Sequence, residues 1–157
     1  MPKEIKYIKG DATAPQGEGR KFIIHCCNDI GAWGAGFVLA LSKNWPEPER
    51  RYKKWKRNGR GFKLGHIQVV KVEKDIYVIN MIGQRDIKTK NGVPPIRYGS
   101  INKCLKKVAE LAKEYKATVH APRFGAGLAG GKWEKIEDLI TEQLIDQDIK
   151  VTVYDID

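Results

Sequence analysis

Polar side chains that could take part in chemistry follow an apolar run near the N-terminus. The run Phe22–Ile24 leads into His25, two cysteines and Asn28, and glycines follow at positions 31, 34 and 36. An imidazole exchanges protons near neutral pH, and an amide both donates and accepts hydrogen bonds. Backbone N–H groups of a glycine loop that opens a helix bind phosphate. The stretch 25–36 therefore predicts a site for a phosphorylated ligand.

A second glycine loop, residues 124–131, lies between a short strand and the start of another helix. Neither loop has the glycine spacing of redox-dinucleotide sites or of NTP-binding P-loops. Because each loop follows a strand and opens a helix, both should lie at the carboxyl edge of an α/β sheet, where such folds bind ligands. Two phosphate-type loops at one edge favour a diphosphate over a single phosphate.

Each of these residues also has a purely structural interpretation. Glycines in a strand–helix turn often only relieve crowding, and a histidine late in a buried strand is usually a core residue. Asp11 and Asp29 could be turn or capping residues. Cys27 shares a strand face with His25, but no third group in the sequence orients such a pair, so a cysteine nucleophile is disfavoured. The three histidines lack the spacing of a metal site, and we expect no metal and no cofactor.

The remaining pattern predicts the elements that must position these loops. Apolar alternation and apolar runs predict strands at 3–9, 22–27, 66–72, 76–82, 118–122 and 149–154. Helical periodicity predicts helices of about ten residues from 37, then at 48–57, at 100–115 with Ser100 as the cap, and from 132. Residues 84–98, with their glycine and prolines, form a long functional loop or a partly mobile lid. Alternation of strand and helix predicts an α/β fold with helices on both sides of the sheet.

Positive charge is concentrated in one segment. The net charge is +10, and residues 43–63 contain nine Lys or Arg and two Glu. With Trp45, Tyr52 and Trp55 among these charges, the segment could bind nucleic acid or another polyanion weakly. A solvated helix whose aromatic residues enter the core is the simpler interpretation.

Length and composition set further bounds. At 157 residues we expect one domain, 1–157, with a core of its own. No apolar run approaches the ~20 residues of a membrane span, so no membrane partner is expected. A charged start and three cysteines without a C-x-x-C pair favour a cytoplasmic protein with free thiols. We expect it to act as a monomer.

Three motifs, in this order, resemble the macrodomain family. They are Gly10-Asp11-Ala12-Thr13, His25-Cys26-Cys27-Asn28 before the first glycine loop, and Pro122-Arg123-Phe124-Gly125-Ala126-Gly127-Leu128. Two further stretches, Trp33-Gly34-Ala35-Gly36 and Asn80-Met81-Ile82-Gly83-Gln84, look most like the branch of ADP-ribose-1″-phosphate phosphatases. The resemblance implies a three-layer α/β/α sandwich with a mixed, mostly parallel central sheet. It also implies binding of ADP-ribose and its 1″-phosphate.

The resemblance also assigns parts of the ligand to residues. Asp11 and the backbone of Ala12 match the adenine position, and Tyr154 matches a region that packs near adenine. Asn28 matches the asparagine that contacts the distal ribose, with Trp33 as a wall. The diphosphate is matched by two loops, which comprise Gly34, Ala35 and Gly36, and Gly125, Ala126, Gly127, Leu128 and Ala129.

His25 and Asn28 are the catalytic candidates that the resemblance implies. His25 would face the distal ribose as general base, general acid or nucleophile, and the residues leave these alternatives open. A related branch, which removes ADP-ribose from acidic side chains or DNA bases, uses a lysine where this chain has Gln84. That branch also uses an acid in its second loop, where this chain has residues 128–131 without charge.

The resemblance therefore implies a metal-independent phosphatase that converts ADP-ribose-1″-phosphate to ADP-ribose and phosphate. Alternatives are an ADP-ribose-binding module without catalysis and a hydrolase of ADP-ribosyl groups or O-acetyl-ADP-ribose. A protein that associates with nucleic acid through residues 43–63 is the alternative from a different class.

Overall fold

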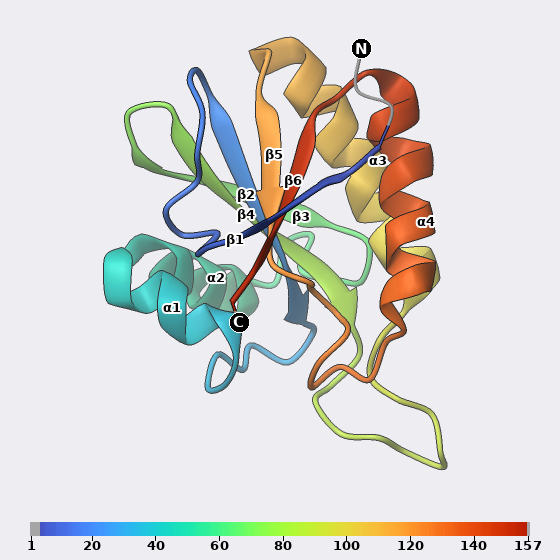
Figure 1. Ribbon diagram of the computed structural model, residues 1–157. Coiled ribbons are helices and arrows are strands. Elements are labelled where there is room, and N and C mark those ends of the chain that lie inside the picture. The colour runs from blue at the N-terminus through green and yellow to red at the C-terminus, as the bar shows by residue number, and fades with distance from the viewer. Residues whose placement is uncertain (1–3, 157) are drawn as a thin grey trace.

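The computed structural model describes residues 4–156, which form one six-stranded sheet with helices on both of its faces (Figure 1). The strands are β1 (Lys6–Lys9), β2 (Lys21–Asn28), β3 (Ile67–Glu73), β4 (Ile76–Gln84), β5 (Thr118–Ala121) and β6 (Val151–Asp155). The helices are α1 (Phe37–Asn44), α2 (Glu47–Asn58), α3 (Tyr98–Tyr115), α4 (Trp133–Gln143) and the 3₁₀ turn η1 (Ile145–Gln147).

The sheet has the order β1-β6-β5-β2-β4-β3 and is parallel except for the antiparallel β3–β4 pair. It therefore confirms the expected mixed, mostly parallel sheet. Helices α1 and α2 cover one face, and α3 and α4 cover the other (Figure 1). The carboxyl ends of β5, β2 and β4 are neighbours, so the loops that follow them meet at one edge.

Strand β2 supplies side chains to both cores because it is buried on both faces. Phe22 and Ile24 belong to the larger core under α3 and α4, whereas Ile23 and Cys27 belong to the smaller core under α1 and α2. This alternation confirms that His25 and Cys27 share one face and that Cys26 takes the other.

The predicted elements agree with the structure to within a few residues at their ends. Lys3, which the sequence places in the opening strand, lies outside the described residues. Ser100 is not the cap of α3, because the helix begins at Tyr98 with an extended Arg97 at its N-cap. The preceding Ile96 is bridged to Gln84, and this pairing holds the chain extended up to the helix. Among residues 4–156, no helix has the length and apolarity needed to cross a membrane.

Candidate functional site

The first glycine loop is shaped by the side chain of Asn28. Its Oδ1 accepts hydrogen bonds from the N–H groups of Ile30 and Ala32, and its Nδ2 donates to the carbonyl of Ala32. The Tyr52 hydroxyl, from α2, lies 2.8 Å from the same Oδ1 and 2.5 Å from the Asn28 carbonyl. Asn28 thus fixes the turn that leads from β2 into the loop and ties that turn to α2.

The first loop ends at Gly36, which has a φ of 83° and is the N-cap of α1. This left-handed conformation favours glycine, and it turns the chain into the helix. Within the described residues, the backbone N–H groups of 34–38 donate to no protein acceptor. Unpaired N–H groups at a helix N-terminus carry partial positive charge, so this loop can bind an anion.

The second loop is held by close backbone packing. Gly125 has a φ of 76°, and its carbonyl accepts a hydrogen bond from the N–H of Gly131. A Cβ on Gly131 would lie 2.4 Å from that carbonyl oxygen, so the loop closes only with glycine there. The Ala129 carbonyl accepts from Ile96 N–H. The N–H groups of 125–129 have no acceptor among the described residues, which gives a second set of free donors.

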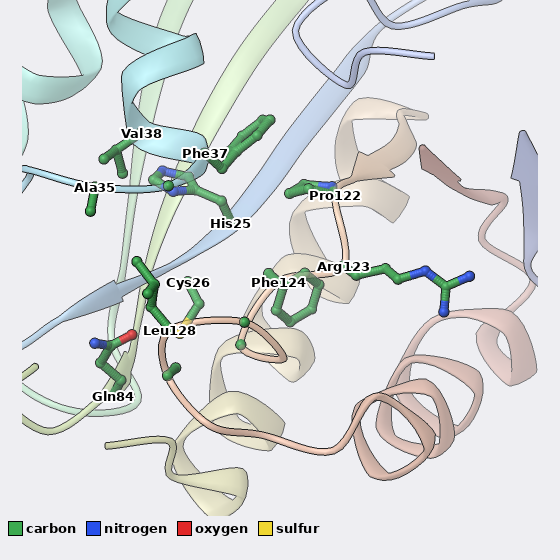
Figure 2. A pocket seen from close by; sticks show the side chains of 14 residues that line it. His25, Cys26, Ala35, Phe37, Val38, Gln84, Pro122, Arg123, Phe124 and Leu128 are labelled. Carbon is green, nitrogen blue, oxygen red and sulfur yellow. The ribbon is translucent and has the colours of Figure 1, made fainter. Parts of the chain in front are cut away.

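Two cavities form a continuous groove between the loops. One has a volume of about 260 Å³, and the other, of about 400 Å³, lies nearer to Asn28. They share Cys26, Ala35, Val38, Gln84 and Leu128. Figure 2 shows the first cavity, with Ala35 and Val38 across from Leu128. The groove therefore brings the first loop and the second loop to one site.

His25 lies at the inner wall of the first cavity. Its ring packs against Trp33 and Phe37, with ring centroids 5.5 Å and 5.8 Å away, and the residue is only 1% exposed. Figure 2 shows the ring beneath the start of α1, beside Phe37. The imidazole is therefore enclosed by aromatic side chains and meets the cavity at its edge.

The hydrogen bonds of Asn80 determine which nitrogen of His25 carries the proton. Asn80 Nδ2 donates to the Pro48 carbonyl at 3.2 Å and to Gln68 Oε1 at 3.0 Å, so its Oδ1 faces His25. This Oδ1 lies 2.6 Å from His25 Nε2, and an amide oxygen only accepts. We therefore assign the proton to Nε2 and the free lone pair to Nδ1.

Burial lowers the pKa of His25 from 6.5 to about 4, and the hydrogen bond with Asn80 opposes that shift. The ring is neutral at pH 7, with Nδ1 able to accept a proton.

The two neighbouring cysteines are poor nucleophiles. Burial raises the pKa of Cys26 to about 12 and that of Cys27 well above its ordinary value. Cys27 Sγ lies 3.7 Å from His25 Nε2. The same Sγ lies 3.9 Å from Nδ1, and the raised pKa of Cys27 keeps this thiol protonated at neutral pH. Buried, protonated thiols of this kind are weak nucleophiles.

The three residues matched to adenine lie away from the groove. Asp11 is exposed, and its Oδ1 accepts from the N–H and the hydroxyl of Thr13. Ala12 and Tyr154 are buried. The Tyr154 hydroxyl accepts from Gln16 N–H and lies 2.7 Å from His120 Nδ1. None of the three lines either cavity, and their role in binding adenine stays a prediction.

Most of the other predicted site residues line the groove. They are His25, Asn28 and every predicted residue of the two loops except Ala126. Trp33 lies behind the first loop, 6% exposed, and donates from Nε1 to Ser42 Oγ. It therefore backs His25 and is not in the cavity wall.

Sequence reasoning gave no role to several residues of the site, among them Phe37, Val38, Asn80 and Ile87. Asn80 had a usable signal, because a lone amide inside the apolar strand 76–82 requires a buried partner. Ile87 lines the second cavity from the 84–98 loop, beside Gln84. Asp29 joins this loop to the first one, since its Oδ1 accepts from Asp86 N–H.

Solved structures with this arrangement cover nearly all of the chain. The Macro domain family matches residues 24–140. A protein of unknown function from Bacteroides thetaiotaomicron is 57% identical, with a TM-score of 0.97 and 98% of each chain covered. A macrodomain protein from Streptomyces coelicolor is 49% identical, with a TM-score of 0.87, covering 97% of this chain and 99% of that one.

Curated relatives are more distant. The chromodomain-helicase-DNA-binding protein 1-like of Danio rerio is 31% identical across 96% of this chain, which spans only 15% of that protein's length. An ADP-ribose 1″-phosphate phosphatase of Candida albicans is 26% identical, covering 88% of this chain and 92% of its own. The ADP-ribose glycohydrolase OARD1 of Bos taurus is also 26% identical, covering 96% and 90%.

Proposed function

Because this chain belongs to the macrodomain family, we propose that it binds ADP-ribose derivatives in the groove and hydrolyses ADP-ribose-1″-phosphate to ADP-ribose and phosphate. The observation that carries the proposal is the pair of loops whose free N–H groups, at 34–38 and 125–129, line one groove. A similar protein in Candida albicans is an ADP-ribose 1″-phosphate phosphatase.

In this proposal the diphosphate lies between the two loops. Backbone N–H groups can bind its oxygens from both sides, with no cation needed in the wall. The adenine extends toward Asp11, Ala12 and Tyr154. The distal ribose extends toward the second cavity, beside Asn28 and Gln84, with its 1″-phosphate where the two cavities meet, on the side of His25.

His25 acts in this proposal as general base or as nucleophile through Nδ1. In the base route, water gives a proton to Nδ1 and attacks phosphorus; in the nucleophilic route, Nδ1 attacks and water then hydrolyses the phosphohistidine. In both routes the bond between phosphorus and O1″ breaks, and O1″ takes up a proton that comes from water. A general acid must carry a proton at working pH, and a pKa of about 4 leaves the ring neutral. The acid role is therefore the least favoured of the three alternatives. Free N–H groups of the first loop stabilise the charge that develops on the phosphoryl oxygens.

We expect His25→Ala to reduce phosphate release from ADP-ribose-1″-phosphate by about 100-fold or more, the usual contribution of a proton-transfer group. ADP-ribose affinity should change little, because the loop N–H groups remain. Phosphate release and isothermal titration calorimetry with ADP-ribose measure the two effects. His66→Ala is the matched control, since His66 lies outside both cavities. Full activity in His25→Ala would remove the histidine from the mechanism.

A second candidate function is ADP-ribose binding without turnover. It is favoured by the engagement of both ends of the Asn28 amide within the loop and by the near-complete burial of His25. Saturable ADP-ribose binding with no consumption of the 1″-phosphate would support it over the phosphatase.

The third candidate is hydrolysis of ADP-ribosyl groups or O-acetyl-ADP-ribose, and the Bos taurus relative is named a glycohydrolase. Gln84 lines both cavities at the position matched to the lysine of the related branch. An amide cannot form the covalent adduct that a lysine amine forms with an aldehyde. A substrate panel of ADP-ribosylated peptide, O-acetyl-ADP-ribose and ADP-ribose-1″-phosphate separates this candidate from the first.

A further inference from the structure

A row of three polar side chains crosses the sheet beneath α2. Strand pairing places His25 of β2 opposite Asn80 of β4, and Asn80 opposite Gln68 of β3. The next row on the same face contains only buried apolar side chains, which are those of Ile23, Val78 and Val70. Apolar residues therefore suffice to build this face of the sheet, and the polar row needs a reason of its own.

Stability alone does not supply that reason. His25 is 1% exposed and Asn80 is 0% exposed. Burying an amide or an imidazole is unfavourable unless it is hydrogen-bonded. The hydrogen bonds of the row offset this cost, but apolar side chains of similar shape would avoid it, as they do in the next row. The row therefore points to what its polarity does at the His25 end.

Helix α2 sets the direction of the hydrogen bonds in the row. The Arg51 carbonyl accepts from Gln68 Nε2 at 3.0 Å, and the Pro48 carbonyl accepts from Asn80 Nδ2 at 3.2 Å. Because a backbone carbonyl only accepts, both amides turn their N–H groups toward α2. Gln68 Oε1 then accepts from Asn80 Nδ2 at 3.0 Å, which leaves Asn80 Oδ1 to face His25 Nε2 at 2.6 Å. Two backbone carbonyls thus set the surroundings of an imidazole two strands away.

This direction matters for a ring that acts through Nδ1. An amide oxygen beside Nε2 keeps a proton on that nitrogen, and it stabilises the positive charge that the ring gains when Nδ1 takes up a second proton. With the amide turned around, an NH₂ group would face Nε2, and the ring would have to carry its proton on Nδ1. The other contacts of the ring are with Cys27, Trp33 and Phe37, and among these the Cys27 thiol is the group that titrates.

We propose that Asn80 and Gln68 are positioning residues for His25, which keep its proton on Nε2 and leave Nδ1 free to accept a proton or to attack phosphorus. The proposal rests on the proposed function and adds to it two residues that line neither cavity. Gln68 acts at a distance, through Asn80. Because neither side chain touches the ligand, their loss should slow the reaction without weakening the binding of ADP-ribose.

The experiment uses paired variants of the row. Asn80→Leu removes the oxygen that accepts from Nε2, whereas Asn80→Asp keeps an acceptor there and removes the N–H donors. Gln68→Leu breaks the row at its partly exposed end, where a substitution disturbs folding least. Gln143→Leu is the matched control, because it also removes a partly exposed amide with a side-chain hydrogen bond, to Asn102 on α3.

We expect Asn80→Leu to lower kcat for ADP-ribose-1″-phosphate by about tenfold or more, but by no more than His25→Ala does. Gln68→Leu should lower kcat by about threefold to tenfold, the equivalent of one neutral hydrogen bond. In both variants KM, and the Kd of ADP-ribose measured by calorimetry, should stay within about twofold of the wild type, because the lost contacts act on the transition state. The control variant Gln143→Leu should match the wild type in all three.

The Asn80→Asp variant separates positioning from packing, because it lacks the N–H donors of Asn80 just as Asn80→Leu does. Its carboxylate favours the doubly protonated ring and so raises the pKa of His25 from about 4. Below the raised pKa, Nδ1 carries a proton and cannot act. We therefore expect kcat of Asn80→Asp to be well below the wild type at pH 6 and to approach it at pH 9. Asn80→Leu should stay slow at both pH values.

Nitrogen-15 NMR of the histidine side chains locates the proton without any turnover. In the wild type, His25 should carry its proton on Nε2, and the spectrum of His25→Ala identifies the signal by its loss. The resonance of this proton should move upfield in Asn80→Leu, because its hydrogen bond is lost. It should move less in Gln68→Leu and should not move in Gln143→Leu.

A proton on Nδ1 in the wild type would overturn the inference, as would a Gln68→Leu variant that matches Gln143→Leu in kcat and in the NMR spectrum. Full activity in Asn80→Leu would overturn it and leave the proposed function standing. If the wild type releases no phosphate, the phosphatase fails. The spectra then decide the inference, which stands only if the proton lies on Nε2 and its resonance moves in Gln68→Leu. If Asn80→Leu does not fold, the comparison of Gln68→Leu with Gln143→Leu decides it.

Discussion

His25 and Asn28 lie three residues apart on strand β2, yet their surroundings give them different roles. Every polar atom of the Asn28 amide bonds to the loop or to Tyr52, so this residue builds the cavity wall. His25 donates from Nε2 to Asn80, and its Nδ1, which carries the lone pair, lies 3.9 Å from the Cys27 thiol. The amide that fixes this state is Asn80, which is fully buried and bonded on three sides.

We expect Asn80→Ala to lower the free energy of unfolding by about 2–4 kcal/mol. The change leaves the buried His25 N–H and Gln68 carbonyl without partners and opens a cavity beneath α2. Urea unfolding measures the loss. Asn102→Ala is the matched control, because Asn102 lies partly exposed on α3 with one hydrogen bond to Gln143, and its loss should stay within about 1 kcal/mol. Equal losses in the two variants would contradict the role given to Asn80.

The strands and helices could be predicted from the sequence because the spacing of apolar residues follows directly from which side of each element is buried. The strand expected at 22–27 is β2, and the second loop follows β5 as expected. Contacts between distant residues could not be predicted in this way. Nothing near Trp33 in the sequence shows that Ser42 and His25 would hold it behind the loop.

Two glycines of the second loop differ in the space around them: a Cβ at Gly131 would collide with the backbone, whereas a Cβ at Gly127 would not. We expect Gly131→Ala to lower the free energy of unfolding by about 1–3 kcal/mol, because the new Cβ meets the Gly125 carbonyl oxygen. Gly127 lines the first cavity, and a Cβ there has no atom within 4 Å. Gly127→Val should therefore fold normally and lose ADP-ribose binding at least tenfold.

Thermal unfolding and calorimetry with ADP-ribose separate the two glycine variants. Gly99→Val, at another position with open space around its Cβ but outside the groove, controls for the valine itself. Normal ADP-ribose affinity in Gly127→Val would mean that the diphosphate does not pass this loop.

Two of the three histidines lie inside the molecule, whereas most of the basic residues that the structure describes lie at its surface. His25 and His120 are both buried, one beneath α1 and the other between Thr118 and Tyr154. Burial lowers the pKa of each to about 4, and the charge of Lys21 adds to the effect at His120. The fold thus depends on two neutral imidazoles.

This arrangement predicts a fold that weakens in mild acid. In the unfolded chain both histidines take up protons as the pH falls through 6.5, whereas in the folded chain they do so only near 4. The stabilisation is therefore complete above about pH 6.5 and is lost as the pH falls toward 4. Linkage gives a loss in the free energy of unfolding of ~2 kcal/mol per histidine between pH 7 and pH 5, or ~4 kcal/mol in all.

Urea unfolding at pH 7 and at pH 5 measures this loss, and His120→Gln should remove about half of the difference between the two pH values. His66→Gln should leave most of it, because His66 is partly exposed. A stability that is unchanged between pH 7 and pH 5 would show that the two imidazoles titrate normally in the folded chain.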